Sequence, residues 1–177
     1  MKTTLNKIRE KEPCADGWEK LLKHLGKTSS DDEELSILTI LNSNGLDDAV
    51  WCLRAVDGCD KDIRMYAVWC ARQVQHLMTD ERSLSALDVV ERFANGKATS
   101  NELKVAGDAA WDAAWDAGWD ATKAAASTAA CAAAWDATRT AACVAAWDAT
   151  RAATRAAGWD AGDAGDAQEK QLRSICK

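Results

Sequence analysis

Hydrophobic residues in the first hundred positions recur every three or four residues, and Gly, Asn or Asp residues separate one run from the next. This spacing places the apolar side chains on one face of a helix, and so it predicts short amphipathic helices. The acidic residues 31–33 suit the positive end of a helix dipole and favour a helix start just before them. We expect helices over 18–25, from a Ser30 cap to Asn44-Gly45, over 46–56, from about 60 to 77, and from a Thr79 or Asp80 cap to Asn95-Gly96.

A four-residue repeat occupies about a third of the chain, from Asp108 to Asp163. Alanine stands at every fourth position from Ala109 to Ala161, and the column two places before it holds the tryptophans of the array. An aspartate follows each of these tryptophans, which are Trp111, Trp115, Trp119, Trp135, Trp147 and Trp159. Repeats of this kind dictate architecture, because each unit needs its neighbours to bury its apolar face.

Alanine is the best helix former, and so the array is predicted to be helical. A single helix over these residues would be about 84 Å long, which is improbable for a chain of this size. A period of four also turns each successive tryptophan by about 40° around the helix. We therefore expect a break near 122–128, where tryptophans are missing, and an antiparallel helix pair that packs on the N-terminal helices. The alanines would allow close approach, and the tryptophans would fill the remaining space.

These patterns together predict an all-α protein, a bundle or short solenoid of amphipathic helices with long alanine-rich helices packed against it. The composition changes near the start of the array, which suggests an N-terminal multi-helix region at 1–104 and the repeat helices at 105–177. We expect the two regions to form one compact unit.

A hexapeptide is duplicated in the N-terminal region: Ala-Val-Trp-Cys-Leu-Arg at 49–54 recurs as Ala-Val-Trp-Cys-Ala-Arg at 67–72. Tryptophan and arginine three residues apart share a helix face, so the guanidinium can lie over the indole or reach a carboxylate. One interpretation is that stacked helices use the same packing solution twice. The other is a partner-binding surface, because both residue types are common at interaction hot spots. The candidate residues are Trp51, Arg54, Trp69 and Arg72.

Charged residues within the array are further candidates for partner binding. Asp136 and Asp148 each stand three residues before an arginine, at the spacing of a helical ion pair. The tryptophan column varies to arginine, cysteine, serine and lysine, which is compatible with neutral drift on a solvent-exposed face or with a variable recognition surface. The array candidates are Arg139, Arg151, Arg155, Asp136 and Asp148.

The net charge of −6 argues against direct nucleic-acid binding and is compatible with a basic protein partner. No apolar run is long enough to span a membrane, and the N-terminus has no secretion signal, so we expect a cytoplasmic protein. The seven cysteines are irregularly spaced, as is typical of free thiols. A zinc site at Cys52, Cys59, Cys70 and His76 is disfavoured because no C-x-x-C pair exists, so no metal or cofactor is expected.

Catalysis is also disfavoured. Neither His24 nor His76 has an evident catalytic partner, and the chain contains no phosphate-binding loop and no nucleophile elbow. Aspartates that repeat along an array do not define one site.

The segments SILTILNSNGLDDAVWCLRAVDG and DIRMYAVWCARQVQHLMTDERSLSALDVVERFANG, followed by the Ala-Trp-Asp array, resemble a family of bacterial and phage immunity proteins, the immunity-five-like group. The resemblance covers nearly the whole chain, and it implies an all-α protein that neutralises a toxin by direct binding. It implies no catalytic residues.

The sequence therefore predicts a non-enzymatic protein-binding module, an immunity or inhibitor protein whose partner is a toxin or nuclease. One alternative is a helical scaffold that self-associates through the array as a homo-oligomer. Another is a small-ligand or nucleotide-binding helical protein, with tryptophan for stacking and arginine for phosphate.

Overall fold

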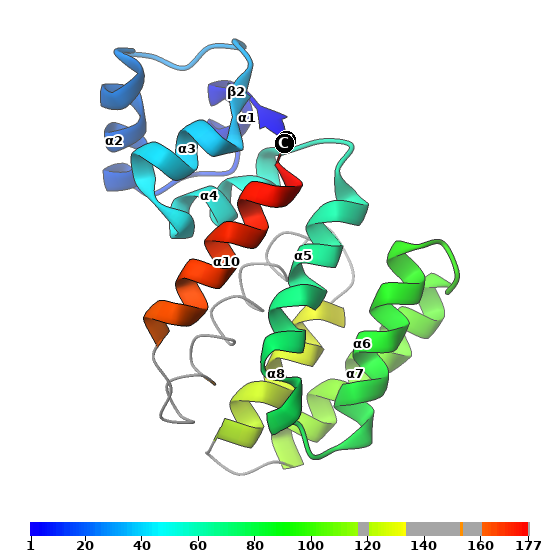
Figure 1. Cartoon of the computed structure of the whole chain (residues 1–177). Helices are drawn as coiled ribbons and strands as arrows, with labels where there is room; N and C mark the ends of the chain where they lie inside the picture. Colours follow the sequence, from blue (N-terminus) through cyan, green and yellow to red (C-terminus); the bar gives the residue numbers. More distant parts are fainter. Residues whose placement is uncertain (117–120, 134–152, 154–160, 177) are drawn as a thin grey trace. The chain divides into compact units, whose positions relative to one another are not determined.

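The computed structural model describes residues 1–116, 121–133, 153 and 161–176 of the chain (Figure 1). These residues form helices and one short two-stranded antiparallel ladder, which confirms the all-α prediction. Within the described residues, no helix combines the length and the apolar character that a membrane crossing requires.

The chain divides into two compact units that differ from the two regions expected from composition. Unit 1 comprises Met1–Cys59 and Glu169–Lys177, and unit 2 comprises Asp60–Gln168. The boundary expected between residues 104 and 105 falls inside helix α7 (Ser100–Asp116). The array therefore continues a helix that begins before it.

Unit 1 is built from short elements around an aliphatic core. The strands β1 (Lys2–Thr3) and β2 (Leu35–Ser36) pair antiparallel, with Lys2 opposite Ser36. Helix α3 contacts both α2 and α4. The helical elements are α1 (Leu5–Arg9), α2 (Ala15–Leu25), α3 (Ile37–Asn44), α4 (Leu46–Cys52), η1 (Leu53–Ala55) and the part of α10 (Ala161–Ile175) from Glu169 onward. The core side chains include Leu5, Ile8, Leu21, Ile37, Ile40, Leu41, Val50 and Leu53.

The predicted start of α3 at Ser30 is wrong, and the predicted end at Asn44-Gly45 is confirmed. Ser36 is the N-cap, because its hydroxyl accepts a hydrogen bond from the Leu38 backbone N–H at 3.2 Å. The acidic run after Ser30 is held by Lys27 instead, whose ammonium pairs with Asp31 at 2.6 Å. Asp31 Oδ1 also accepts a hydrogen bond from the Glu33 backbone N–H at 3.1 Å, and such a local bond competes with helix formation, so the chain runs on to strand β2.

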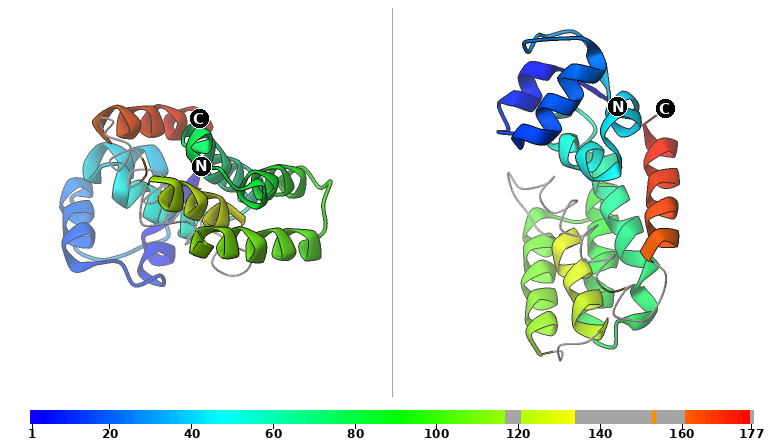
Figure 2. Two further views of the ribbon diagram at one scale, coloured as in Figure 1. Left: turned by 90° about the horizontal axis from the view of Figure 1, so that it is seen from below. Right: turned by 90° about the vertical axis from the view of Figure 1, so that its left-hand side faces the viewer.

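Unit 2 is a helical bundle in which helices α5, α6, α7 and α8 pack together (Figure 2). Its core cluster joins aliphatic residues of the earlier helices to alanines of the array: Val68, Ala86, Val90, Leu103, Ala110, Ala130 and Ala133. Its elements are α5 (Asp60–Gln73), η2 (Gln75–Leu77), α6 (Glu81–Ala94), α7, α8 (Ala121–Ala133) and the part of α10 before Glu169.

Within the array, α7 and α8 pack antiparallel, but the pair differs from the expected one, because the break is not at 122–128. Those residues lie inside α8, whereas α7 ends at Asp116 and α8 begins at Ala121. Gly107, in the first half of α7, lies against Ala133, the last residue of α8, as antiparallel packing requires. The absence of tryptophan does not interrupt a helix, and the alanine-rich sequence there strongly favours one.

Candidate functional site: the indole face of helix α7

Helix α7 turns its small residues inward and its tryptophans outward. Gly107, Ala110, Ala113 and Ala114 are buried. A methyl group placed on Gly107 would come within 3.2 Å of the Ala133 carbonyl oxygen, so the backbones of α7 and α8 approach closely. An indole has no room in such an interface, and the alanine columns occupy it instead.

The two described tryptophans of α7 are both exposed, which corrects the expectation that the array tryptophans fill space between helices. Trp111 is 46% exposed and Trp115 is 76% exposed. The increase follows from the repeat itself, because a period of four carries each successive tryptophan about 40° farther around the helix. Trp111 lies at the edge of the packed face, and Trp115 is turned farther toward solvent.

Aspartates accompany these indoles on the solvent side of α7. Asp108, Asp112 and Asp116 are all exposed. Asp108 pairs with Lys104 at 2.7 Å, and Asp116 pairs with Arg82 at 2.6 Å. Asp112 has no ion-pair partner among the residues that the structure describes. We call Asp108, Trp111, Asp112 and Trp115 the indole face.

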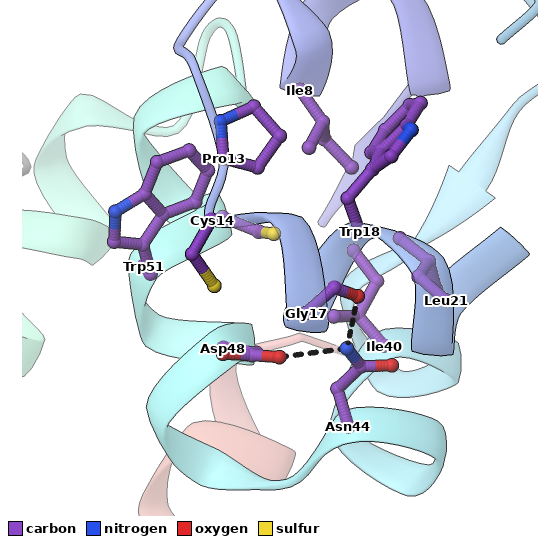
Figure 3. A pocket seen from close by; sticks show the side chains of 11 residues that line it. Ile8, Pro13, Cys14, Gly17, Trp18, Leu21, Ile40, Asn44, Asp48 and Trp51 are labelled. Atoms are coloured by element: carbon purple, nitrogen blue, oxygen red, sulfur yellow. Dashed lines mark hydrogen bonds between the residues drawn. The ribbon is translucent and has the colours of Figure 1, made fainter.

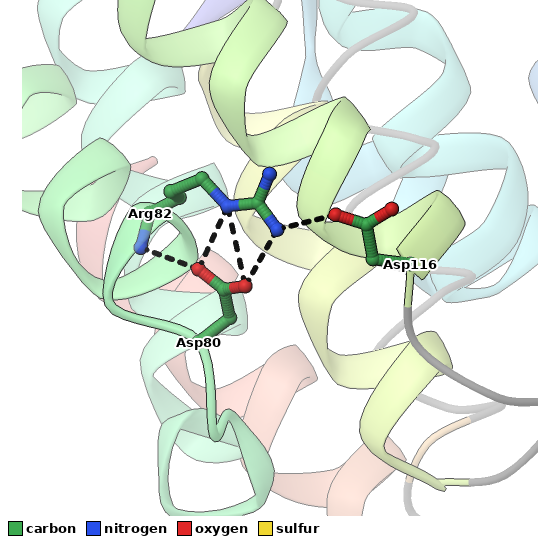
Figure 4. Close-up of polar contacts among 3 residues, drawn as sticks. All are labelled: Asp80, Arg82 and Asp116. Carbon is green, nitrogen blue, oxygen red and sulfur yellow. Dashed lines mark hydrogen bonds and ion pairs between the residues drawn. The ribbon is translucent and has the colours of Figure 1, made fainter.

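An ion-pair cluster fastens the end of α7 to the start of α6 (Figure 4). The Asp80 carboxylate caps α6 by accepting a hydrogen bond from the Arg82 backbone N–H at 2.8 Å. The Arg82 guanidinium donates to Asp80 at 2.7 Å and to Asp116 at 2.6 Å. These hydrogen bonds raise the pKa of Arg82 and lower the pKa of Asp80. The cluster therefore uses one array aspartate to position the helix end next to Trp115.

The duplicated hexapeptides place their tryptophan and arginine residues in different surroundings. The Arg54 guanidinium lies 4.2 Å from the centre of the Trp51 ring, as a cation–π contact. Arg72 instead pairs with Asp88 at 2.7 Å and with a second α6 carboxylate, Glu91, at 2.8 Å. Trp69 stacks on Tyr66, with ring centroids 6.5 Å apart. Both alternatives expected for the arginine therefore occur, one in each copy.

The remaining site candidates, Arg139, Arg151, Arg155, Asp136 and Asp148, lie outside the described residues.

A small pocket in unit 1 contains Trp51 and several residues that the sequence did not single out (Figure 3). Trp18 belongs to the helix expected over 18–25, and its half-buried indole lines this pocket. No sequence pattern links Trp18 with Asp48, because Trp18 comes from α2 and Asp48 from α4. The pocket is lined by Ile8, Pro13, Cys14, Gly17, Trp18, Leu21, Ile40, Asn44, Asp48, Trp51 and Cys52.

The described cysteines, Cys14, Cys52, Cys59, Cys70 and Cys176, are free thiols. Burial raises the pKa of both Cys52 and Cys70 to about 12, which keeps these two thiols protonated at neutral pH. No group of three or more His, Cys, Asp or Glu side chains within the described residues is arranged to hold a metal ion.

Comparisons of this chain with protein-family models, with curated proteins and with solved structures gave no match.

Proposed function

We propose that this protein is a non-enzymatic protein-binding module that binds a basic protein partner through the indole face of α7. In the most specific form of the proposal it is an immunity or inhibitor protein that neutralises a toxin or nuclease by direct binding. That form is favoured by the resemblance of residues 36–96 to immunity proteins.

The observation that carries the proposal is the orientation of α7, with alanines buried and indoles exposed. A tryptophan side chain that becomes covered removes roughly 150–250 Å² of surface from water. Tryptophan is also among the residue types most enriched at binding hot spots. An isolated exposed apolar residue needs no explanation, but two successive turns of one helix that both expose an indole form a patch. Such a patch is suited to a partner surface.

Charge indicates what kind of partner fits. The chain carries a net charge of −6, and carboxylates flank both exposed indoles. Nuclease active sites are cationic, and acidic proteins associate with them rapidly by electrostatic steering that weakens as salt is added. Lysine or arginine side chains of such a partner can pair with Asp112 and stack on the indoles.

Self-association through the same face is the second candidate, because exposed indoles also suit a copy of the same helix. The two functions differ in what they predict for the isolated protein. A two-fold interface between copies would bury Trp111 and Trp115 and make the sedimentation coefficient rise with concentration, whereas a partner-binding module stays monomeric.

The proposal is tested by comparing the full-length protein with a W111A/W115A variant as bait in a lysate of the source strain. Proteins captured by the first bait and not by the second are identified by mass spectrometry, purified, and titrated calorimetrically. We expect the double variant to lose about 30-fold or more in affinity, because one hot-spot tryptophan contributes about 2 kcal/mol. The V105A variant is the control, since Val105 is an exposed α7 residue about 9 Å along the axis from Trp111.

The inhibitor form is tested with the same purified partner. We expect one equivalent of the protein to abolish its toxic activity when both are expressed in one cell. A partner that binds the double variant as tightly as the unmodified protein would contradict the proposed face. A partner that stays active when it is saturated with this protein would contradict only the inhibitor form of the proposal.

A further inference from the structure

We propose that the pocket between Trp18 and Trp51, the Trp18/Trp51 pocket, is a binding site for a primary alkylammonium group. This chemistry is shared by the side chain of lysine and by small free alkylamines. The proposal does not rest on the indole face, because all the lining residues belong to unit 1 and α7 belongs to unit 2.

The size of the pocket limits the ligand to a single short group. Its volume is about 160 Å³. Pockets for drug-sized ligands and cofactors are larger, about 300 Å³ or more, whereas a cavity of about 150 Å³ holds one benzene molecule. A four-carbon chain with one terminal nitrogen is of this size.

One carboxylate supplies the charge of the pocket. Asp48 is half-buried, and the described lining contains no Lys, Arg or His side chain. Its Oδ2 accepts a hydrogen bond from the Asn44 amide nitrogen at 2.7 Å, and the same nitrogen donates to the Gly17 carbonyl oxygen at 2.8 Å. The Ser43 hydroxyl donates to the Asn44 side-chain oxygen at 2.7 Å, which fixes the orientation of the amide. Asp48 is thus positioned before any ligand arrives.

This arrangement favours an ammonium over a guanidinium. A guanidinium binds a carboxylate best through two parallel hydrogen bonds, which require both oxygens. Asp48 Oδ2 already accepts from Asn44 and lies close against Gly17, which leaves little space for a second donor at this oxygen. The other oxygen can accept a single hydrogen bond from an ammonium, which acts as a point charge.

The apolar walls of the pocket also suit an alkylammonium group. Trp18 comes from α2 and Trp51 from α4, and Figure 3 shows their indoles on opposite sides of Cys14 and Gly17. Ile8, Leu21 and Ile40 add aliphatic surface that would pack against the carbon chain of the ligand. An indole face attracts a cation within about 6 Å. Because the Arg54 guanidinium already lies over Trp51, Trp18 is the indole assigned to the ammonium, and Trp51 contributes apolar wall.

Gly17 keeps the carboxylate in place. It lies within helix α2, where alanine would favour the helix more. A Cβ atom at this position would come within 2.9 Å of Asp48 Oδ2 and within 3.1 Å of Cys14 Sγ. A larger residue at position 17 would therefore displace the Asp48 carboxylate from this position.

The test is a titration of the ¹⁵N-labelled full-length protein with n-butylammonium chloride at constant ionic strength. The indole N–H signals of Trp18 and Trp51 are assigned with the W18F and W51F variants. We expect saturable shifts of both signals and none at Trp69, which lies in unit 2. We expect n-butanol, which has the same chain without charge, to bind about tenfold more weakly or worse.

Two variants separate the carboxylate from general charge. D48N should weaken n-butylammonium binding by about tenfold or more, because a hydrogen bond to a charged group is lost. D47N, which removes the same charge one residue earlier on α4, should leave the affinity unchanged. Equal affinities for D48N and the unmodified protein would overturn the proposal.

The comparison of ligands needs no variant and so does not depend on how D48N folds. Equal binding of n-butanol and n-butylammonium, tighter binding of n-butylguanidinium, or the absence of saturable shifts would each overturn the proposal. Nα-acetyl-lysine methylamide identifies the source of the group. Binding of this compound at least as tightly as n-butylammonium supports a lysine side chain, and binding of n-butylammonium alone supports a small free amine.

Discussion

In both copies of the repeated hexapeptide the alanine, valine and cysteine are buried, whereas the tryptophan and arginine have different neighbours. The packing interpretation therefore accounts for what the copies share. Their difference is traced to residues outside the hexapeptide. Three positions before the tryptophan, the first copy has Asp48 and the second has Tyr66. Tyr66 stacks on Trp69, while Asp48 leaves Trp51 beside an open pocket.

The arginines differ for a similar reason. Helix α6 brings Asp88 and Glu91 to Arg72, and the ion pairs draw the guanidinium away from Trp69. Arg54 meets no carboxylate at ion-pair distance among the described residues and lies over Trp51. The comparison teaches that one helical hexapeptide can have different surroundings, and that residues outside it set them.

The largest expected loss of stability comes from a substitution beside the second copy, whose tryptophan is packed against Tyr66. Tyr66 is buried, stacks on Trp69, and donates a hydrogen bond from its hydroxyl to the Gln168 backbone oxygen at 3.3 Å. We expect Y66A to lower the free energy of unfolding by about 3–5 kcal/mol, as for other buried aromatic truncations. D48A, at the equivalent position of the first copy, should cost about 1 kcal/mol or less. Urea denaturation measures both, and equal losses would contradict the distinction between the copies.

Substitution of Arg72 should also lower the free energy of unfolding more than substitution of Arg54, but by a smaller margin. R72A removes two ion pairs and the hydrogen bond to the Gln75 side chain from a guanidinium that is 28% exposed, so we expect a loss of about 1–2 kcal/mol. R54A removes a cation–π contact and the hydrogen bond from Arg54 Nε to the Trp51 carbonyl oxygen at 2.9 Å, from a more weakly held side chain, so we expect a loss of about 1 kcal/mol or less. The same denaturation experiment compares them. A larger loss for R54A would show that the stacked arginine is the structural one.

A single substitution gives the first copy the residue that precedes the tryptophan by three positions in the second copy. In D48Y the new ring is expected to stack on Trp51 and occupy the pocket, as Tyr66 stacks on Trp69. The affinity for n-butylammonium should then fall by about tenfold or more, while the protein stays folded. The indole titration measures the affinity, and circular dichroism is the control for folding. Retained binding would show that position 48 does not decide the role of Trp51.

The smallest effect concerns the ion pairs of unit 2 in acid. The Arg82 hydrogen bonds lower the folded-state pKa of Asp80, so the contribution of this carboxylate to stability is complete above its unfolded value of about 3.9. That contribution is lost as the pH falls through the lowered pKa. We expect the unfolding midpoint to decline below about pH 4, and to decline less in D80N. Identical acid profiles for the two proteins would contradict a stabilising role for this cluster.

Several parts of the fold could be predicted from the sequence because their cause is local. The end of α3 follows from Gly45, whose φ of 98° is in the left-handed region that suits glycine. The cap of α6 at Asp80 is one of the two expected residues. The start of α3 could not be predicted, because residues 35–36 pair with β1, a segment far away in the sequence, before the helix begins.

The outward orientation of the α7 tryptophans could not be predicted from the repeat alone. Its columns were correctly separated into small residues and tryptophans, but which column faces the neighbouring helix depends on the distance between α7 and α8. The contact at Gly107 shows that this distance is short, and the indoles are therefore turned outward. The Trp18/Trp51 pocket was missed for a related reason, since its walls come from separate helices.

The outward orientation of the α7 tryptophans is measured most directly by solvent paramagnetic relaxation enhancement at the indole N–H groups, with a neutral gadolinium chelate in solution. The account predicts the strongest enhancement at Trp115, a smaller one at Trp111, and the weakest at Trp69, which is half-buried against Tyr66. Enhancement at Trp115 as weak as at Trp69 would mean that α7 buries this indole, and the proposed binding face would not exist.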